Sequence, residues 1–178
     1  FGNDDQALAA IDHGVAIGDR SHWGLLKITG SDRLRYLHNQ STNDFEKLKP
    51  GQGCDTVFVT STARTLDLAT AYVTEDAVLV LVSPHRRQQL MAWLDRFIFP
   101  FDKVELTDIS ENTAIFSLLG EQSQTLLSNL TSETISLTDV ADNQLVTIAG
   151  VTVRVALGSG LVTPGYTLIM DRNTAGTV

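Results

Sequence analysis

The sequence contains a single cysteine and few of the short motifs that mark catalytic or metal sites. Cys54 has no Cys or His neighbour at ligand spacing, and the four histidines are scattered, so no metal site is expected. One Cys excludes an internal disulfide framework and weakly favours a reducing compartment. Cys54 is therefore expected to be a small buried side chain at the start of a strand. A glycine-rich phosphate loop and a nucleophile elbow are also absent, so short motifs do not identify an enzyme.

Basic residues are also few. The 178 residues carry 13 Lys and Arg against 21 Asp and Glu, a net charge of −8. Phosphate contacts require a basic surface, so nucleic acid is not an expected partner. No apolar run approaches the roughly 20 residues that a membrane span needs, so no membrane association is expected. Most of the acidic excess lies in residues 91–178, so an anionic small ligand should prefer the first half, which holds Arg33, Arg35, Arg64, Arg86 and Arg87.

What the sequence does contain is a pattern of short strands and helices that predicts an α+β fold in two small lobes, residues 1–110 and 111–178. In the first lobe we expect helices at 6–13, 33–40 and 85–97, and strands at 25–29, 57–59, 65–73, 78–82 and 104–106. The short links between the strands at 57–59, 65–73 and 78–82 require antiparallel neighbours. In the second lobe we expect a helix at 121–130 and strands at 113–119, 135–140, 145–148, 151–156 and 166–170.

Asp67 is the unusual residue of this pattern, because Asp is depleted within strands. Alternation along residues 65–73 places Asp67, Ala69 and Ala71 on one face and Leu66, Leu68, Thr70 and Tyr72 on the other. The second set reads as the better core face. Asp67 is then either a solvated residue on a wet face, or a carboxylate among small side chains that leave room for a flat ligand.

Several motifs in residues 14–82 occur in an order typical of one family. Residues 19–24 read D-R-S-H-W-G, residues 30–32 read G-S-D, residues 37–44 read L-H-N-Q-S-T-N-D, and residues 51–53 read G-Q-G. Together they resemble the N-terminal region of glycine cleavage T-protein and its YgfZ-type folate-binding relatives. The segment 54–60, C-D-T-V-F-V-T, is most similar to a cyanobacterial and plastid subgroup of the YgfZ-type branch.

The resemblance implies packed helices and antiparallel sheets around a folate site, with the family's C-terminal barrel and its K-G-C-Y-x-G-Q-E motif absent from these 178 residues. It implies tetrahydrofolate or a derivative as ligand. Asp67 matches the first Asp of the T-protein run G-G-I-I-D-D-L, where an acidic residue serves one-carbon transfer, but Leu68 replaces the second. Gly165, Tyr166 and Thr167 are similar to the start of the T-protein G-Y-T-G-E, whose Gly-Glu is replaced here by Leu-Ile.

We therefore expect a folate-binding protein of the YgfZ type that is non-catalytic or weakly catalytic and is linked to one-carbon metabolism or iron–sulfur enzyme maintenance. The alternatives are an aminomethyltransferase and an interaction module without folate. The predicted ligand-binding residues are Asp67, Ala69, Arg64 and Tyr166, with Arg86 and Arg87 as further partners for a glutamate tail. If Asp67 lines a wet pocket, its replacement should barely change stability. A cytoplasmic location is expected, or the plastid stroma if a transit segment has been removed.

Overall fold

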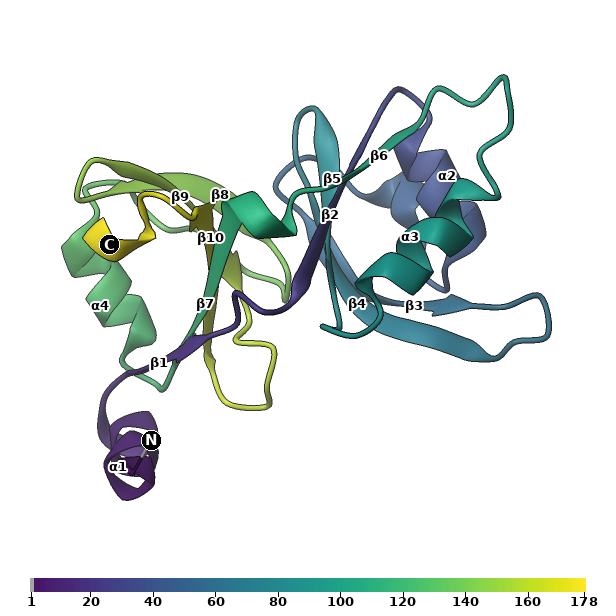
Figure 1. The fold of residues 1–178 in the computed structure, drawn as a ribbon. Coiled ribbons are helices and arrows are strands. Elements are labelled where there is room, and N and C mark those ends of the chain that lie inside the picture. The colour runs from purple at the N-terminus through teal and green to yellow at the C-terminus, as the bar shows by residue number, and fades with distance from the viewer. Residues whose placement is uncertain (1) are drawn as a thin grey trace. The chain divides into compact units, whose positions relative to one another are not determined.

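A computed structural model describes residues 2–178 and divides the chain into two compact units (Figure 1). Residues 22–111 form one, called here the central unit, and residues 2–21 together with 112–178 form the terminal unit. The predicted division at residue 110 differs from this one in the N-terminal residues, which group with the second half of the chain. No helix within residues 2–178 is long and apolar enough to cross a membrane.

The central unit is a five-stranded antiparallel sheet with two helices. The strand order is β3-β4-β5-β2-β6. The strands are β2 (Gly24–Thr29), β3 (Gly53–Val59), β4 (Thr65–Val73), β5 (Ala77–Val82) and β6 (Glu105–Asp108). The two helices are α2 (Arg33–Gln40) and α3 (Arg87–Asp95), and a 3₁₀ turn, η1 (Phe45–Lys47), lies between α2 and β3. The meander of β3, β4 and β5 is antiparallel, which confirms the prediction made from their short connections.

The faces of β4 are the reverse of those predicted. Ala69 and Ala71 are buried in a core cluster with Leu37 of α2 and with Leu90 of α3, whereas Leu68 is 61% exposed. The prediction was wrong because it ranked the faces by side-chain size. Small side chains on β4 belong to the face that the helices cover.

The terminal unit is a second antiparallel sheet, with the strand order β1-β7-β10-β9-β8. It contains α1 (Asp4–His13), β1 (Ala16–Asp19), β7 (Thr113–Leu119), α4 (Ser123–Leu130), β8 (Asn143–Ile148), β9 (Val151–Leu157), β10 (Gly165–Asp171) and η3 (Ala175–Thr177), while the 3₁₀ turn η2 (Ser110–Asn112) lies at the boundary with the central unit. Strand β1, which the sequence pattern did not predict, pairs with β7 and so joins the N-terminal residues to this unit.

The strand predicted at residues 135–140 does not form. Ile135 and Leu137 still pack against the apolar core of the terminal unit. The backbone of this segment bonds to side chains instead of to a neighbouring strand. Gln144 accepts from the N–H of Ser136, and Asp142 accepts from the N–H groups of residues 138 and 139. Buried backbone groups need hydrogen-bond partners, but these partners need not belong to a strand. The apolar spacing of residues 135–140 was therefore not enough to predict a strand.

Thr56 of β3 carries a polar group into the apolar core of the central unit. It is 2% exposed and lies opposite Ala69 on β4, and its Oγ1 has no hydrogen-bond partner among residues 2–178. A buried hydroxyl without a partner costs free energy, and Val has nearly the same shape and a similar strand preference.

We expect Thr56→Val to raise the free energy of unfolding by about 1–2 kcal/mol. The matched control is Thr70→Val on β4, because the Thr70 hydroxyl donates to Asp55 at 2.6 Å. The free energy of unfolding of Thr70→Val should fall by about 0.5–1.5 kcal/mol. Urea unfolding followed by circular dichroism measures both changes. Equal effects in the two variants would show that the Thr56 hydroxyl is satisfied.

Candidate functional site

Asp67 is buried and bonded to a single residue, Ser83. The Asp67 side chain is 6% exposed. Its Oδ2 accepts the backbone N–H of Ser83 at 2.9 Å, and its Oδ1 accepts the Ser83 hydroxyl at 2.7 Å. Ser83 directly follows β5 and begins the connection to α3. The interpretation of Asp67 as a solvated residue on a wet face is therefore wrong, and a small stability effect is no longer expected on replacing it.

Ser83 is a residue of the candidate site that the sequence analysis did not identify. The helix predicted over residues 85–97 was expected to begin two residues after Ser83, whereas α3 begins later, at Arg87. The hydroxyl and the backbone N–H of Ser83 both donate to the carboxylate of Asp67 on the neighbouring strand. A Ser or Thr placed directly after a strand that pairs with an Asp-bearing strand is the sequence signal that could have found it.

Three arginines of the central unit belong to the candidate site by prediction. Arg64 is exposed at the β3–β4 hairpin, where its backbone exchanges hydrogen bonds with Thr60. Arg86 is exposed and donates to the side chain of Gln89, while the half-buried Arg87 forms an ion pair with Asp108 at 3.1 Å. Arg86 and Arg87 follow Ser83 by three and four residues in the chain, but their side chains bond to Gln89 and Asp108 and not to the Asp67–Ser83 pair.

The other two predicted residues lie in apolar surroundings. Ala69 is 2% exposed within the core cluster of the central unit. Tyr166 belongs to the terminal unit, where it is 6% exposed in the apolar cluster and opposite Leu118 of β7. Burial raises the pKa of the Tyr166 phenol. A ligand role for Ala69 and for Tyr166 remains a prediction.

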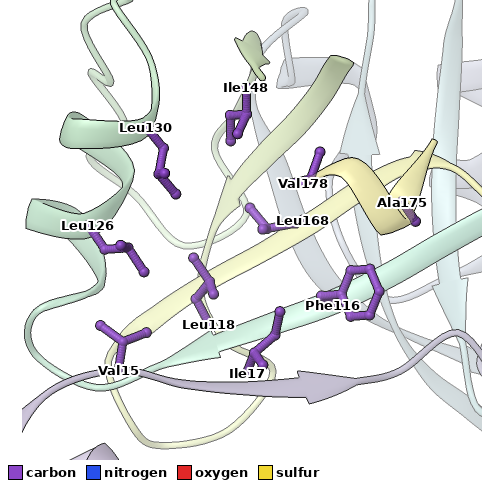
Figure 2. Close-up of a pocket in the computed structure, with 10 residues that line it drawn as sticks. All are labelled: Val15, Ile17, Phe116, Leu118, Leu126, Leu130, Ile148, Leu168, Ala175 and Val178. Atoms are coloured by element: carbon purple, nitrogen blue, oxygen red, sulfur yellow. The ribbon is translucent and has the colours of Figure 1, made fainter. Parts of the chain in front are cut away.

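The terminal unit also contains an apolar cavity of about 290 Å³. Figure 2 shows its lining side chains converging from α4, the sheet and the C-terminal turn: Val15, Ile17, Phe116, Leu118, Leu126, Leu130, Ile148, Leu168, Ala175 and Val178. None of them offers a hydrogen bond. Ligand pockets combine apolar walls with a few placed polar groups, so this cavity has no means of orienting a polar ring.

The segment 41–44, which carries the densest motif match, ties the end of α2 to β3. Ser41 donates its hydroxyl to Leu37, and the Thr42 hydroxyl accepts from the N–H of Val57. Asn43 donates to the carbonyl of Asp55. Asp44 forms an ion pair with Lys47, which lowers the pKa of the Asp44 carboxyl, and its other oxygen lies 3.2 Å from Nδ1 of His38. These contacts explain the motif by structure alone.

Two further motifs have the same character. Gly30 has a φ of 100°, and a Cβ there would lie 1.9 Å from the carbonyl oxygen of Lys103, so only glycine fits. Asp32 accepts from the N–H of the same Lys103 at 2.9 Å. In the terminal unit, Arg20 donates to the carbonyl of Ser159 at 3.1 Å. The motifs at 19–24 and 30–32 therefore fix connections within each unit.

Cys54 lies at the start of β3, as predicted, but its side chain is half-buried and not fully buried as expected. Burial, with a smaller contribution from the charge of Asp55, raises the pKa of its thiol to about 11. A thiol in this state is a poor nucleophile near neutral pH, because the thiolate is the reactive form. Across the described part of the chain, no group of three His, Cys, Asp or Glu side chains could hold a metal ion.

Comparison with known proteins gives a consistent result. The family model described as the GCVT N-terminal domain matches residues 3–177. A chloroplastic protein of Arabidopsis thaliana that is named as a transferase is 42% identical over 178 residues, which are 100% of this chain and 41% of that protein. An aminomethyltransferase of Halalkalibacterium halodurans is 32% identical over 65% of this chain and 31% of its own length. The chain thus spans less than half of these relatives.

A solved structure supports the fold. The aminomethyltransferase T of the glycine cleavage system from Bartonella henselae superposes with a TM-score of 0.81 over 97% of this chain and 47% of that chain, at 16% identity. The α+β architecture predicted from the sequence is confirmed by this likeness.

We expect Asp67→Ala to lower the free energy of unfolding by about 1.5–3 kcal/mol, because two half-buried donors of Ser83 lose their carboxylate acceptor. Ser83→Ala should cost about 1 kcal/mol, since the backbone N–H keeps its bond. Asp55→Ala is the matched control, because Asp55 also accepts from a hydroxyl but is exposed. Urea denaturation measures the three changes. An unchanged midpoint in Asp67→Ala would contradict the buried pair and restore the wet-face interpretation.

Proposed function

Because the chain belongs to the GCVT N-terminal domain family, we propose that it binds tetrahydrofolate or one of its derivatives as a protein of the YgfZ type. The observation that carries the proposal is the Asp67 carboxylate, on the strand where the resemblance places an acidic ligand-binding residue. Its role would be to orient the pterin ring, whose N–H groups are donors, through charge-assisted hydrogen bonds. Arg64, Arg86 and Arg87 are proposed to attract the glutamate tail.

The hydrogen bonds of Asp67 leave it able to accept from a ligand. A carboxylate has about four lone-pair sites, and Ser83 uses one on each oxygen. Asp67 therefore keeps acceptor capacity for a pterin donor. The Ser83 bonds would also hold the carboxylate in one orientation before a ligand arrives, which reduces the entropy lost on binding.

An aminomethyltransferase is the second candidate, and the bacterial relatives that carry this name favour it. Against it stand the substitutions at the two T-protein motifs. Leu68 replaces the second Asp and is 61% exposed, while Leu168 and Ile169 replace the Gly-Glu and are buried. We therefore place folate binding without aminomethyl transfer first, in support of one-carbon metabolism or of iron–sulfur enzymes. The chloroplastic relative favours a plastid location beside the cytoplasmic one expected from the sequence.

Calorimetry with tetrahydrofolate and with 5-formyltetrahydrofolate tests the proposal. We expect binding of at least one of them, and Asp67→Asn should weaken it about tenfold to hundredfold, which is the loss of one charge-assisted bond. Absence of binding to both folates would contradict the proposal and favour an interaction module. Release of ammonia from an aminomethyl-lipoyl substrate in a reconstituted assay would instead select the enzyme.

Ser83→Ala separates a ligand role of Asp67 from a structural one. If Asp67 acts only through stability, affinity should fall in proportion to the stability lost in each variant. If Asp67 contacts the ligand, Asp67→Asn should lose much more affinity than Ser83→Ala. Asp55→Asn, an exposed carboxylate on the neighbouring strand, should leave affinity unchanged.

A further inference from the structure

A groove of about 560 Å³ lies between α3 and β6 of the central unit. Its floor is apolar and is formed by Met91, Ile98, Val104 and Leu106. Acidic side chains stand on both sides, with Asp95 on α3 and Glu105 on β6. None of these residues belongs to the candidate folate site.

The strand that borders this groove is an edge strand. β6 pairs with β2 through Glu105–Asp108 and ends the strand order of its sheet (Figure 1). Glu105 and Thr107 are exposed, while Leu106 is half-buried. An edge strand offers a row of backbone N–H and C=O groups that can pair with an added strand.

Three carboxylates line the groove, and two of them form no ion pair among residues 2–178. Asp108 pairs with Arg87 at 3.1 Å. In contrast, neither Asp95 nor Glu105 forms an ion pair with any residue that the structure describes. Two free carboxylates beside an apolar floor suit Lys or Arg side chains, whose aliphatic stems can lie on apolar surface while the charged ends reach the acids.

The connection from α3 to β6 presents further apolar surface in a fixed turn. Phe99 is 63% exposed and Phe101 is 94% exposed. Asp102 holds the turn by accepting the N–H of Phe99 at 2.9 Å and by pairing with Arg35 at 3.0 Å. Aromatic rings are enriched where proteins meet, so their exposure on an ordered turn next to β6 in the chain indicates a protein partner.

We propose that this groove binds an extended, cationic segment of a partner protein, which adds to β6 as a further strand. Apolar side chains at alternate positions of the segment lie on Met91 and Leu106, and the Lys or Arg side chains between them face Glu105, which lies on the opposite face of β6. A basic residue at the end of the paired stretch reaches Asp95 on α3. A second copy of this chain fits less well. Pairing two β6 edges would bring the same acidic side chains together, and like charges on adjacent strands are destabilising.

Fluorescence anisotropy with two labelled peptides tests the proposal on the 178-residue chain. The cationic probe is Lys-Val-Arg-Val-Lys-Val, and its acidic counterpart carries Glu in place of each basic residue. We expect the cationic peptide to bind and the acidic peptide not to bind. The affinity for the cationic peptide should fall as the salt concentration increases. The double variant Asp95→Lys and Glu105→Lys should bind it at least roughly tenfold more weakly, since charged hydrogen-bonding partners are lost.

The matched control is the double variant Glu46→Lys and Glu75→Lys, which makes the same change in net charge at exposed sites of the same unit. It should keep the wild-type affinity, and the amide signals of β6 should shift on binding in nuclear magnetic resonance spectra. Equal losses in the two double variants would reduce the effect to nonspecific attraction and overturn the proposal. It is also overturned if the cationic peptide fails to bind at about 1 mM, if the acidic peptide binds equally, or if sedimentation shows dimers that Glu105→Lys disrupts.

Discussion

The hydrogen bonds between Asp67 and Ser83 are the interaction on which the central unit depends. A carboxylate on a helix-covered face is costly unless its oxygens are bonded, and Ser83 provides one donor to each oxygen. The same bonds fix the point at which the chain leaves β5. Helix α3 begins four residues later, buries Leu90 and Leu94 in the core, and forms one side of the groove beside β6. The candidate folate site and the proposed docking groove therefore share one anchored helix.

The motifs that reveal the family act mainly on structure. Gly30 admits the backbone of Lys103, residues 41–44 tie α2 to β3, and Arg20 bonds to the carbonyl of Ser159. A resemblance carried by such residues is strong evidence for the fold, since each meets a local steric or hydrogen-bonding need. It is weaker evidence for chemistry, which in the proposed function rests on Asp67 and a few cations.

Most elements could be predicted from the sequence because they depend on local signals. Apolar alternation marked β4 and β5, and the short links between them required antiparallel pairing. Three features could not be predicted, because they depend on distant residues. β1 forms only against β7, about 100 residues away. Residues 135–140 are bonded by side chains such as Gln144. The helices determine which face of β4 is covered, so Asp67 was assigned to the wrong environment, and its role as a site residue remains a prediction.

The claim that most needs a direct measurement is that Asp67 meets a folate while Ser83 holds it in place. The side-chain carboxyl carbon of Asp67 can be followed by nuclear magnetic resonance in aspartate-labelled chain, with its signal assigned from Asp67→Asn. During titration with 5-formyltetrahydrofolate, the account predicts that this signal shifts and saturates together with the signals of the pterin ring. Binding of the folate with no change at the Asp67 carboxyl carbon would contradict it.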